Sequence, residues 1–122
     1  MKNDPGLALR QFIFGLRVFF RRPTAGNILR MARFIFRRYA LSSPVPFSVV
    51  YAVTYKCQCR CVHCSVADYG VSGDELDTSQ ALGLIDGIAD WGAVKITFFG
   101  GEPLVREDLC GLAAHAAARG LR

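Results

Sequence analysis

The sequence predicts an α/β fold in which basic amphipathic helices precede two β–α units. Two stretches rich in β-branched and aromatic residues are each followed by a loop and then by a helical pattern. Such units build parallel sheets through right-handed connections. The charge also changes along the chain: residues 1–40 carry nine Lys or Arg and one acid, whereas residues 41–122 carry six and nine. The basic character therefore belongs to the segment before the predicted sheet.

Residues 1–42 predict a helical region with two basic amphipathic helices, at about 7–20 and 28–39. The second has a stripe of arginines opposite an apolar face that includes Leu29 and Phe36. Helices of this kind can lie in a membrane interface, so an anionic membrane surface is a candidate partner for residues 7–40. The alternative is that they contact the rest of the chain or a partner, with solvated arginines. Nucleic acid is not favoured, because the aromatic residues fall on the apolar face.

The expected location is the cytoplasm, with a peripheral position at the membrane surface as the alternative. Arginines interrupt every apolar run of the first 40 residues before it reaches the roughly 18 residues of a membrane span. No small-residue cleavage site follows the first apolar run, so a secretory signal is not expected. Thiols stay reduced in the cytoplasm, and a cysteine cluster there indicates metal or redox chemistry.

The α/β part is expected to begin after a Ser-Pro-Val-Pro boundary at residues 43–46 and to form a second domain over 47–122. Composition predicts strands over 47–54 and 93–99. Capping residues and apolar spacing predict one helix from Asp77 or Thr78 to Trp91, closed by Gly92, and a second over 108–119, ended by Gly120.

A cysteine-rich loop follows the first predicted strand. Cys57, Cys61 and Cys64 have the spacing C-x3-C-x2-C, and Cys59 lies between the first two. Thiols this crowded cannot easily pair as disulfides, which need a specific separation and orientation. Soft thiolates suit zinc or an iron–sulfur cluster, and nearby positive charge favours the thiolate form. The loop therefore predicts a metal or cluster site.

A second motif, Gly100-Gly101-Glu102-Pro103, follows the second predicted strand. Together the two motifs resemble those of the radical S-adenosylmethionine (radical SAM) superfamily. The resemblance implies a 4Fe–4S cluster bound by Cys57, Cys61 and Cys64, whose fourth iron takes the amino and carboxylate groups of S-adenosylmethionine. It also implies a partial or full (β/α) barrel, of which residues 47–122 would be the first two of about six units.

The resemblance assigns roles in cofactor binding as well. Gly100 and Gly101 would let the backbone approach the ligand, Glu102 would accept hydrogen bonds from the methionine amine, and Pro103 would shape the turn. His63 would lie near the adenine. Both motifs follow strands, so they are expected at the carboxyl edge of the sheet, where α/β proteins place their sites. No catalytic residue is predicted beyond the cluster ligands.

The implied function is that of a radical SAM enzyme. A donor such as flavodoxin or ferredoxin would reduce the cluster, and reductive cleavage of S-adenosylmethionine would give a 5′-deoxyadenosyl radical that abstracts hydrogen from an unknown substrate. Two alternatives stay open: a non-catalytic zinc or iron–sulfur module, and a membrane-interface anchor. Two β–α units leave an open sheet edge, so the chain is expected to be the amino-terminal part of a longer enzyme or a truncated product.

Separate expectations apply to three further residues. Cys59 is expected to be a free thiol, with a fourth ligand position as the alternative. Cys110 is expected to be a small buried hydrophobe on the second helix. His115 has no acidic partner in view along the sequence, and a structural or exposed position is expected for it.

Overall fold

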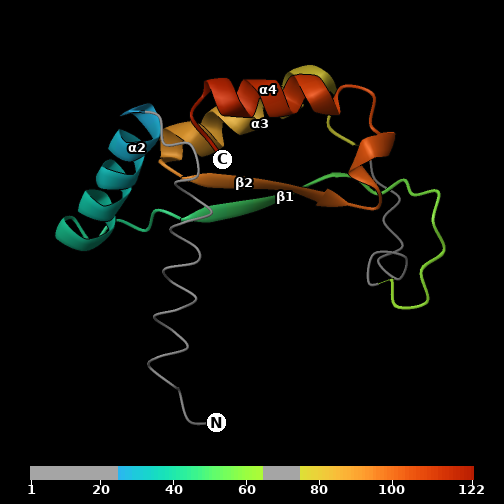
Figure 1. Cartoon of the computed structure of the whole chain (residues 1–122), viewed down its shortest axis with the longest axis horizontal. Helices are drawn as coiled ribbons and strands as arrows, with labels where there is room; N and C mark the ends of the chain where they lie inside the picture. The colour runs from blue at the N-terminus through green and yellow to red at the C-terminus, as the bar shows by residue number, and fades with distance from the viewer. Residues whose placement is uncertain (1–24, 65–74) are drawn as a thin grey trace, which may run out of the picture.

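The structure is a computed structural model that describes residues 25–64 and 75–122 (Figure 1). The helix expected at 7–20 and most of the loop expected at 65–77 lie outside these ranges. The elements are, in chain order, α2 (Ala25–Ile35), the π-helical turn η1 (Phe36–Ala40), β1 (Ser48–Thr54), α3 (Thr78–Trp91), β2 (Lys95–Gly100), the 3-10 turn η3 (Pro103–Val105) and α4 (Leu109–Ala118).

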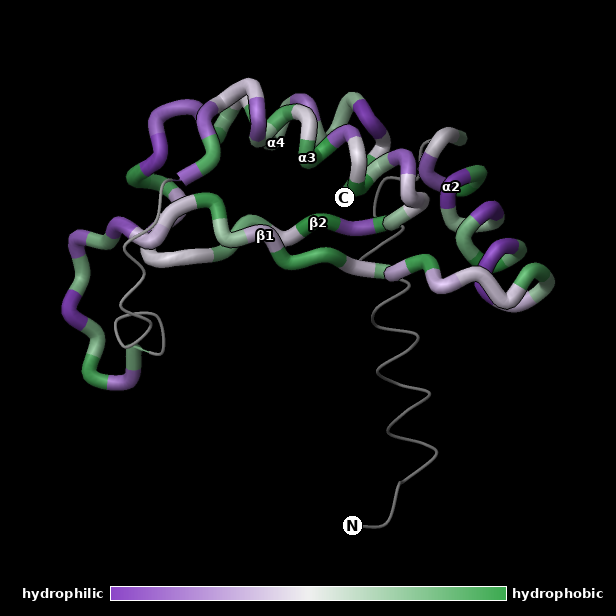
Figure 2. Tube along the Cα trace, turned by 180° about the vertical axis from the view of Figure 1, so that it is seen from behind, coloured by the Kyte–Doolittle hydropathy of each residue, from purple (hydrophilic) through white to green (hydrophobic). Residues whose placement is uncertain are grey.

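The strands β1 and β2 form a parallel two-stranded sheet, and α3 and α4 lie together on one of its faces (Figures 1 and 2). The edge of β2 that does not face β1 also forms backbone hydrogen bonds, with Arg122. Arg122 donates its N–H to the Val94 carbonyl at 3.1 Å and accepts from the Ile96 N–H at 2.8 Å. This is the hydrogen-bond pattern of a parallel ladder. The α/β order and the parallel pairing agree with the predicted β–α units.

The hydrophobic core lies between the sheet and the two helices. Alternate residues of the strands point toward the helices, and Tyr51 and Phe98 meet edge to face with ring centroids 6.3 Å apart. On the opposite face of the sheet, Val50 and Phe99 keep 62% and 48% of their surface exposed. The buried core residues of the strands and helices are Tyr51, Val53, Ile96, Ala81, Ile85, Ile88, Ala89, Leu112 and Ala116.

The predicted ends of α3 are confirmed. Asp77 accepts a hydrogen bond from the Gln80 N–H at 2.8 Å, and the Gln80 side chain accepts one from the Asp77 N–H at 3.0 Å. This reciprocal capping box satisfies two N–H groups that the first turn leaves unpaired. At the other end Gly92 takes a left-handed conformation with φ of 103°.

The prediction for Cys110 is wrong, because its side chain is exposed. The buried face of α4 follows the helical spacing of Leu112 and Ala116, with Leu109 partly buried beside them. Cys110 follows Leu109 directly in the sequence, so it lies to the side of the buried face. His115 does have an acidic partner: its Nε2 lies 2.8 Å from Oδ1 of Asp86 on α3.

Helix α2 and the turn η1 contact the carboxyl ends of α3 and α4 through one arginine each, Arg30 and Arg37. The Arg30 guanidinium donates to the Ala89 carbonyl at 3.2 Å, to the Ala93 carbonyl at 2.8 Å and also to the Arg119 carbonyl. Arg37 donates to the Trp91 carbonyl at 3.0 Å. These carbonyls lie at or just beyond the carboxyl ends of α3 and α4, where a cation also complements the helix dipole.

Burial is the main cause that lowers the pKa of the Arg30 guanidinium, followed by the charges of Arg119 and Arg33. The hydrogen bonds to carbonyls compensate this desolvation. Within residues 25–64 and 75–122, no helix has the length and apolar character needed to cross a bilayer.

Replacing Arg30 by Ala should destabilise the protein by about 2 kcal/mol, because carbonyl groups at two helix ends would lose a charged donor. The matched control is Arg38→Ala, an exposed arginine in the following turn, for which a change within about 0.5 kcal/mol is expected. Urea unfolding followed by circular dichroism measures both. Equal effects of the two substitutions would contradict this role of Arg30.

Candidate functional site

The two sequence motifs lie at the same edge of the sheet. The cysteine loop follows the end of β1 and the Gly100–Pro103 segment begins at the end of β2, so both lie at the end opposite α2 (Figure 1). Their backbones are directly bonded. The Gly101 N–H donates to the Thr54 carbonyl at 2.8 Å, and the Glu102 N–H donates to the Lys56 carbonyl at 3.0 Å. The glycine motif is thus attached to the chain that enters the cysteine loop.

This attachment requires both glycines. A Cβ on Gly100 would lie 1.9 Å from the Thr54 carbonyl oxygen, and φ of Gly100 is 136°. A Cβ on Gly101 would lie 2.4 Å from the Lys56 carbonyl oxygen. The close approach that these residues allow is to the backbone after β1. Their predicted contact with a ligand stays a prediction.

Glu102 and Pro103 begin the turn η3. The Glu102 carboxylate accepts a hydrogen bond from the Leu104 N–H at 3.1 Å through Oε1, and Pro103 occupies the first position of the turn. A carboxylate offers about four acceptor positions over its two oxygens, so this capping bond is compatible with a further donor. The predicted bond from the methionine amine to Glu102 is not tested by this geometry.

The cysteine loop holds four free thiols. Cys57, Cys59 and Cys61 are exposed and Cys64 is partly buried. The Cys59 backbone nitrogen lies 3.3 Å from the Cys57 sulfur. The electrostatic effect of Cys57 is the largest cause that raises the pKa of the Cys59 thiol. Cys64 donates its N–H to the Cys61 carbonyl at 3.2 Å, which closes a turn. His63 is exposed in the same loop.

The loop supplies suitable ligands without a preformed cage. Across residues 25–64 and 75–122, no three His, Cys, Asp or Glu side chains converge on one metal position. The chemistry of the thiols nevertheless fits a cluster: they are soft donors that form no disulfide, three of the four are exposed, and all share one short segment. Hydrogen bonds to sulfur, such as that from Cys59 to Cys57, also tune iron–sulfur centres.

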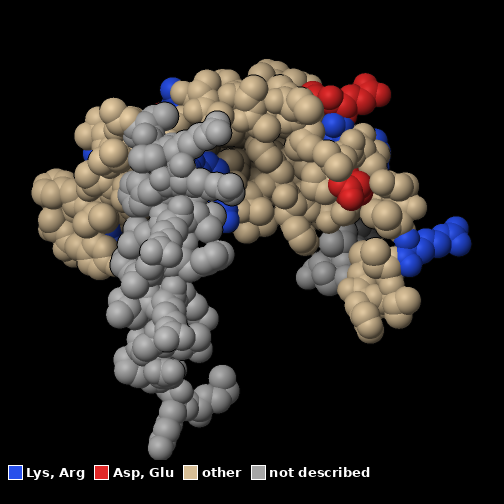
Figure 3. All heavy atoms as spheres, in the orientation of Figure 1, with Lys and Arg blue, Asp and Glu red and all other residues tan. Residues whose placement is uncertain are grey.

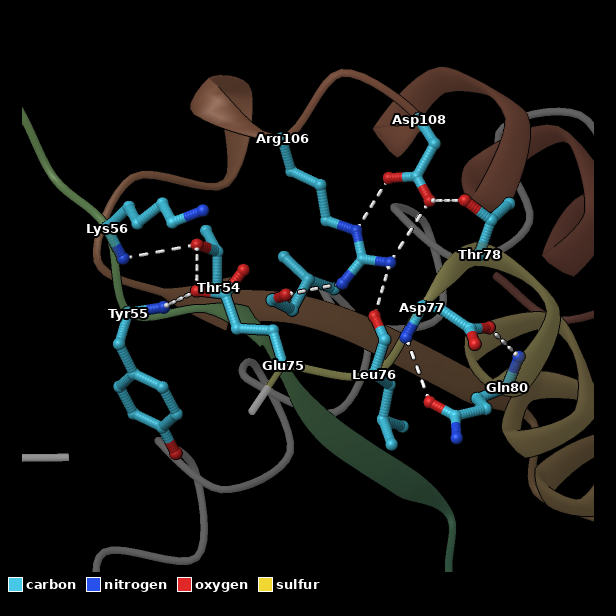
Figure 4. Close-up of polar contacts among 11 residues, drawn as sticks. Thr54, Tyr55, Lys56, Glu75, Leu76, Asp77, Thr78, Gln80, Arg106 and Asp108 are labelled. Carbon is cyan, nitrogen blue, oxygen red and sulfur yellow. Dashed lines mark hydrogen bonds and ion pairs between the residues drawn. The ribbon is translucent and has the colours of Figure 1, made fainter. Parts of the chain in front are cut away.

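Glu75 closes the base of this loop, and the sequence pattern did not reveal it (Figure 4). Its Oε1 accepts from the Thr54 hydroxyl at 2.7 Å and from the Tyr55 N–H at 3.1 Å. The Thr54 hydroxyl in turn accepts from the Lys56 N–H at 3.1 Å. The hydrogen bond from Thr54 is the main cause that lowers the pKa of the Glu75 carboxyl. The two ends of the segment 55–75 are therefore held together.

Arg106 also went unpredicted, and it connects the elements around the site (Figure 4). Its guanidinium donates to the Val53 carbonyl at 2.7 Å and to the Leu76 carbonyl at 2.9 Å. It also forms a two-point ion pair with Asp108, with distances of 2.6 and 3.0 Å. Asp108 accepts a further hydrogen bond from the Thr78 hydroxyl at 2.7 Å. One side chain thus links β1, the entry to α3 and the start of α4.

The fold and the site define a class of protein: a parallel α/β domain whose carboxyl edge carries a cysteine-rich loop bonded to a glycine-rich turn. The sequence profile of the "Radical SAM superfamily" matches residues 51–122. The chain therefore belongs to the radical SAM superfamily, as its two motifs predicted.

Two relatives show the extent of the similarity. The chain is 41% identical to "Fe-coproporphyrin III synthase" of Methanosarcina barkeri over 75 aligned residues. The alignment covers 61% of this chain and 19% of that protein. It is 39% identical to "PqqA peptide cyclase" of Xanthomonas euvesicatoria over 80 aligned residues. That alignment covers 65% of this chain and 22% of that protein. The chain thus spans about a fifth of the length of these relatives. No solved structure matches it significantly.

Substituting Gly100 by Ala should destabilise the protein by at least about 2 kcal/mol, because the new Cβ meets the Thr54 carbonyl and the backbone is left-handed. The control is Gly87→Ala on the exposed side of α3, where a Cβ meets nothing within 4 Å. That change should stabilise by about 0.5–1 kcal/mol. Thermal and urea unfolding compare them, and equal stability of the two variants would refute the close approach.

Replacing Asp108 by Asn should change the acid dependence of stability. The ion pair with Arg106 lowers the pKa of Asp108 from 3.8 to about 2. A lowered carboxyl pKa stabilises the fold above about pH 4, the unfolded value, and this stabilisation is lost as the pH falls toward 2. At pH 7 the free energy of unfolding of the wild type should be about 1–2 kcal/mol larger than that of the variant. The difference in unfolding free energy should shrink as the pH falls through 2 and disappear below it, and a gap that is constant with pH would exclude this ion pair as its source.

Proposed function

We propose that this chain forms the cluster-binding and cofactor-binding part of a radical SAM enzyme. Cys57, Cys61 and Cys64 are the cluster ligands, and the turn at residues 100–103 binds the methionine end of S-adenosylmethionine. The observation that carries this proposal is the pair of backbone hydrogen bonds from Gly101 and Glu102 to the entry of the cysteine loop. A cofactor that bridges the cluster and the glycine turn needs these two segments side by side.

The cluster and cofactor, when bound, supply a reductive cleavage that gives methionine and a 5′-deoxyadenosyl radical, with one electron from a donor such as flavodoxin or ferredoxin. The residues of the chain bind and orient. Glu102 accepts hydrogen bonds from the methionine amine, and the glycines keep the turn against the loop. His63 packs near the adenine.

The residues around the ligands hold this arrangement. Glu75 keeps the base of the loop closed, and Arg106 connects β1 to the start of α4. The sheet face opposite the helices carries two exposed apolar side chains, Val50 and Phe99, and Phe99 lies directly before the glycine turn. Such a surface favours exclusion of water beside a bound cofactor.

The proposed reaction is hydrogen abstraction from a substrate carbon by the radical. The names of the relatives refer to different molecules, Fe-coproporphyrin III and a PqqA peptide, so the substrate is left open. Residues 47–122 are proposed as the amino-terminal part of the radical SAM core and residues 1–42 as a separate helical region. The proposed location is cytoplasmic.

The test is anaerobic reconstitution with iron and sulfide, followed by electron paramagnetic resonance of the reduced protein with and without S-adenosylmethionine. Wild type should give a 4Fe–4S signal that shifts when the cofactor is added. Cys61→Ala should lose most of the cluster iron, because one of three ligands is removed. Cys59→Ala is the matched control, two residues away in the same loop, and it should keep the cluster and the shift.

Two outcomes would count against the proposal. Tight tetrahedral zinc binding that needs Cys59 as much as Cys61, with no iron–sulfur cluster formed, would assign the loop to a four-thiol zinc module. A cluster whose signal ignores S-adenosylmethionine would refute the role of residues 100–103 in this chain.

A further inference from the structure

An apolar stripe of exposed side chains runs along α2 and η1 and consists of Ile28, Leu29, Ile35, Phe36 and Tyr39. None of the residues of α2 is buried. The large side chains at positions 28, 29, 35, 36 and 39 fall within about a third of the helical wheel, which places them on one helical face. Their exposed fractions are 52% for Ile28, 60% for Leu29, 49% for Ile35, 59% for Phe36 and 78% for Tyr39.

The orientation of this helix is the reverse of ordinary helix packing. An amphipathic helix normally buries its apolar face and exposes its charges. Here Arg30 and Arg37 point to the carbonyls at the ends of α3 and α4, and the apolar face remains outside. Contiguous apolar surface of this kind indicates an interaction site.

The borders of the stripe are positively charged. Arg33 and Arg38 are both exposed, and helical spacing puts them on opposite sides of the stripe. The sequence has no Asp or Glu between Asp4 and Asp68. On the face shown in Figure 3, no acidic side chain is visible over α2, and the visible acids lie toward the opposite end of the molecule.

We propose that this stripe docks on an anionic lipid bilayer. A helix with bulky apolar residues on one face and arginines along its borders matches a bilayer interface, where side chains enter the acyl boundary and guanidinium groups meet phosphates. A second copy of the chain fits less well. Two such stripes facing one another would bring arginine borders together with no acid from α2 or η1 to pair them.

The test uses the full chain and sedimentation with vesicles of phosphatidylcholine containing phosphatidylglycerol or of phosphatidylcholine alone. Wild type should bind the anionic vesicles and bind the neutral ones at least tenfold more weakly. Leu29→Glu combined with Phe36→Glu should lower binding to anionic vesicles at least tenfold. The matched control is Leu84→Glu, an exposed apolar position on α3, which should leave binding unchanged. Arg33→Gln with Arg38→Gln should weaken binding and reduce its dependence on salt.

The folded state of each variant is checked by its unfolding temperature, which should stay near wild type because Leu29 and Phe36 are exposed. Undiminished binding of the Leu29→Glu, Phe36→Glu protein would overturn the proposal, since residues other than the stripe would then hold the vesicles. Equal binding to neutral vesicles would also overturn it. So would self-association in sedimentation velocity that this double variant abolishes, because the occupant would then be a second copy.

Discussion

The Arg106 guanidinium is the interaction on which the carboxyl edge of the sheet depends. Four of its N–H donor contacts go to the Val53 carbonyl, the Leu76 carbonyl and the two oxygens of Asp108. The side chain is only 9% exposed, and a charge so far removed from water is stable only when its donors are paired. Each partner belongs to a different segment around the site. Their relative positions are therefore set by the geometry of one planar group.

A second arginine has the corresponding role at the opposite edge. Arg30 satisfies carbonyls where α3 and α4 end, which is where the dipoles of both helices concentrate negative charge. The layer of helices is thus held at both ends by side chains that come from outside it. The site edge and the α2 edge are separated by the length of β1, about 23 Å for seven residues. A surface bound by α2 and a cofactor bound at the site would contact different ends of the molecule.

The features that could be predicted from the sequence depend on residues close to one another along the chain. Asp77, Gln80 and Gly92 determine the ends of α3 through contacts within a few residues, and the cysteine spacing is likewise a short-range pattern. The residues that were missed act over longer separations. Arg106 reaches Val53 across 53 positions, and His115 reaches Asp86 across 29. Nothing in composition or periodicity reveals such pairs. The exposure of Cys110 was also missed, since the burial of a small residue depends on which side of α4 meets α3.

The closed base of the cysteine loop affects how the thiols can meet a metal ion. Glu75 binds Thr54 and Tyr55, so residues 55 and 75 are already held together. The entropic cost of joining chain ends grows with the logarithm of loop length, as about (3/2)RT ln n. This loss of entropy is part of the free energy of folding and does not occur again when a ligand binds. The four thiols lie between these joined ends, so a metal ion bound by them would not have to close this loop as well.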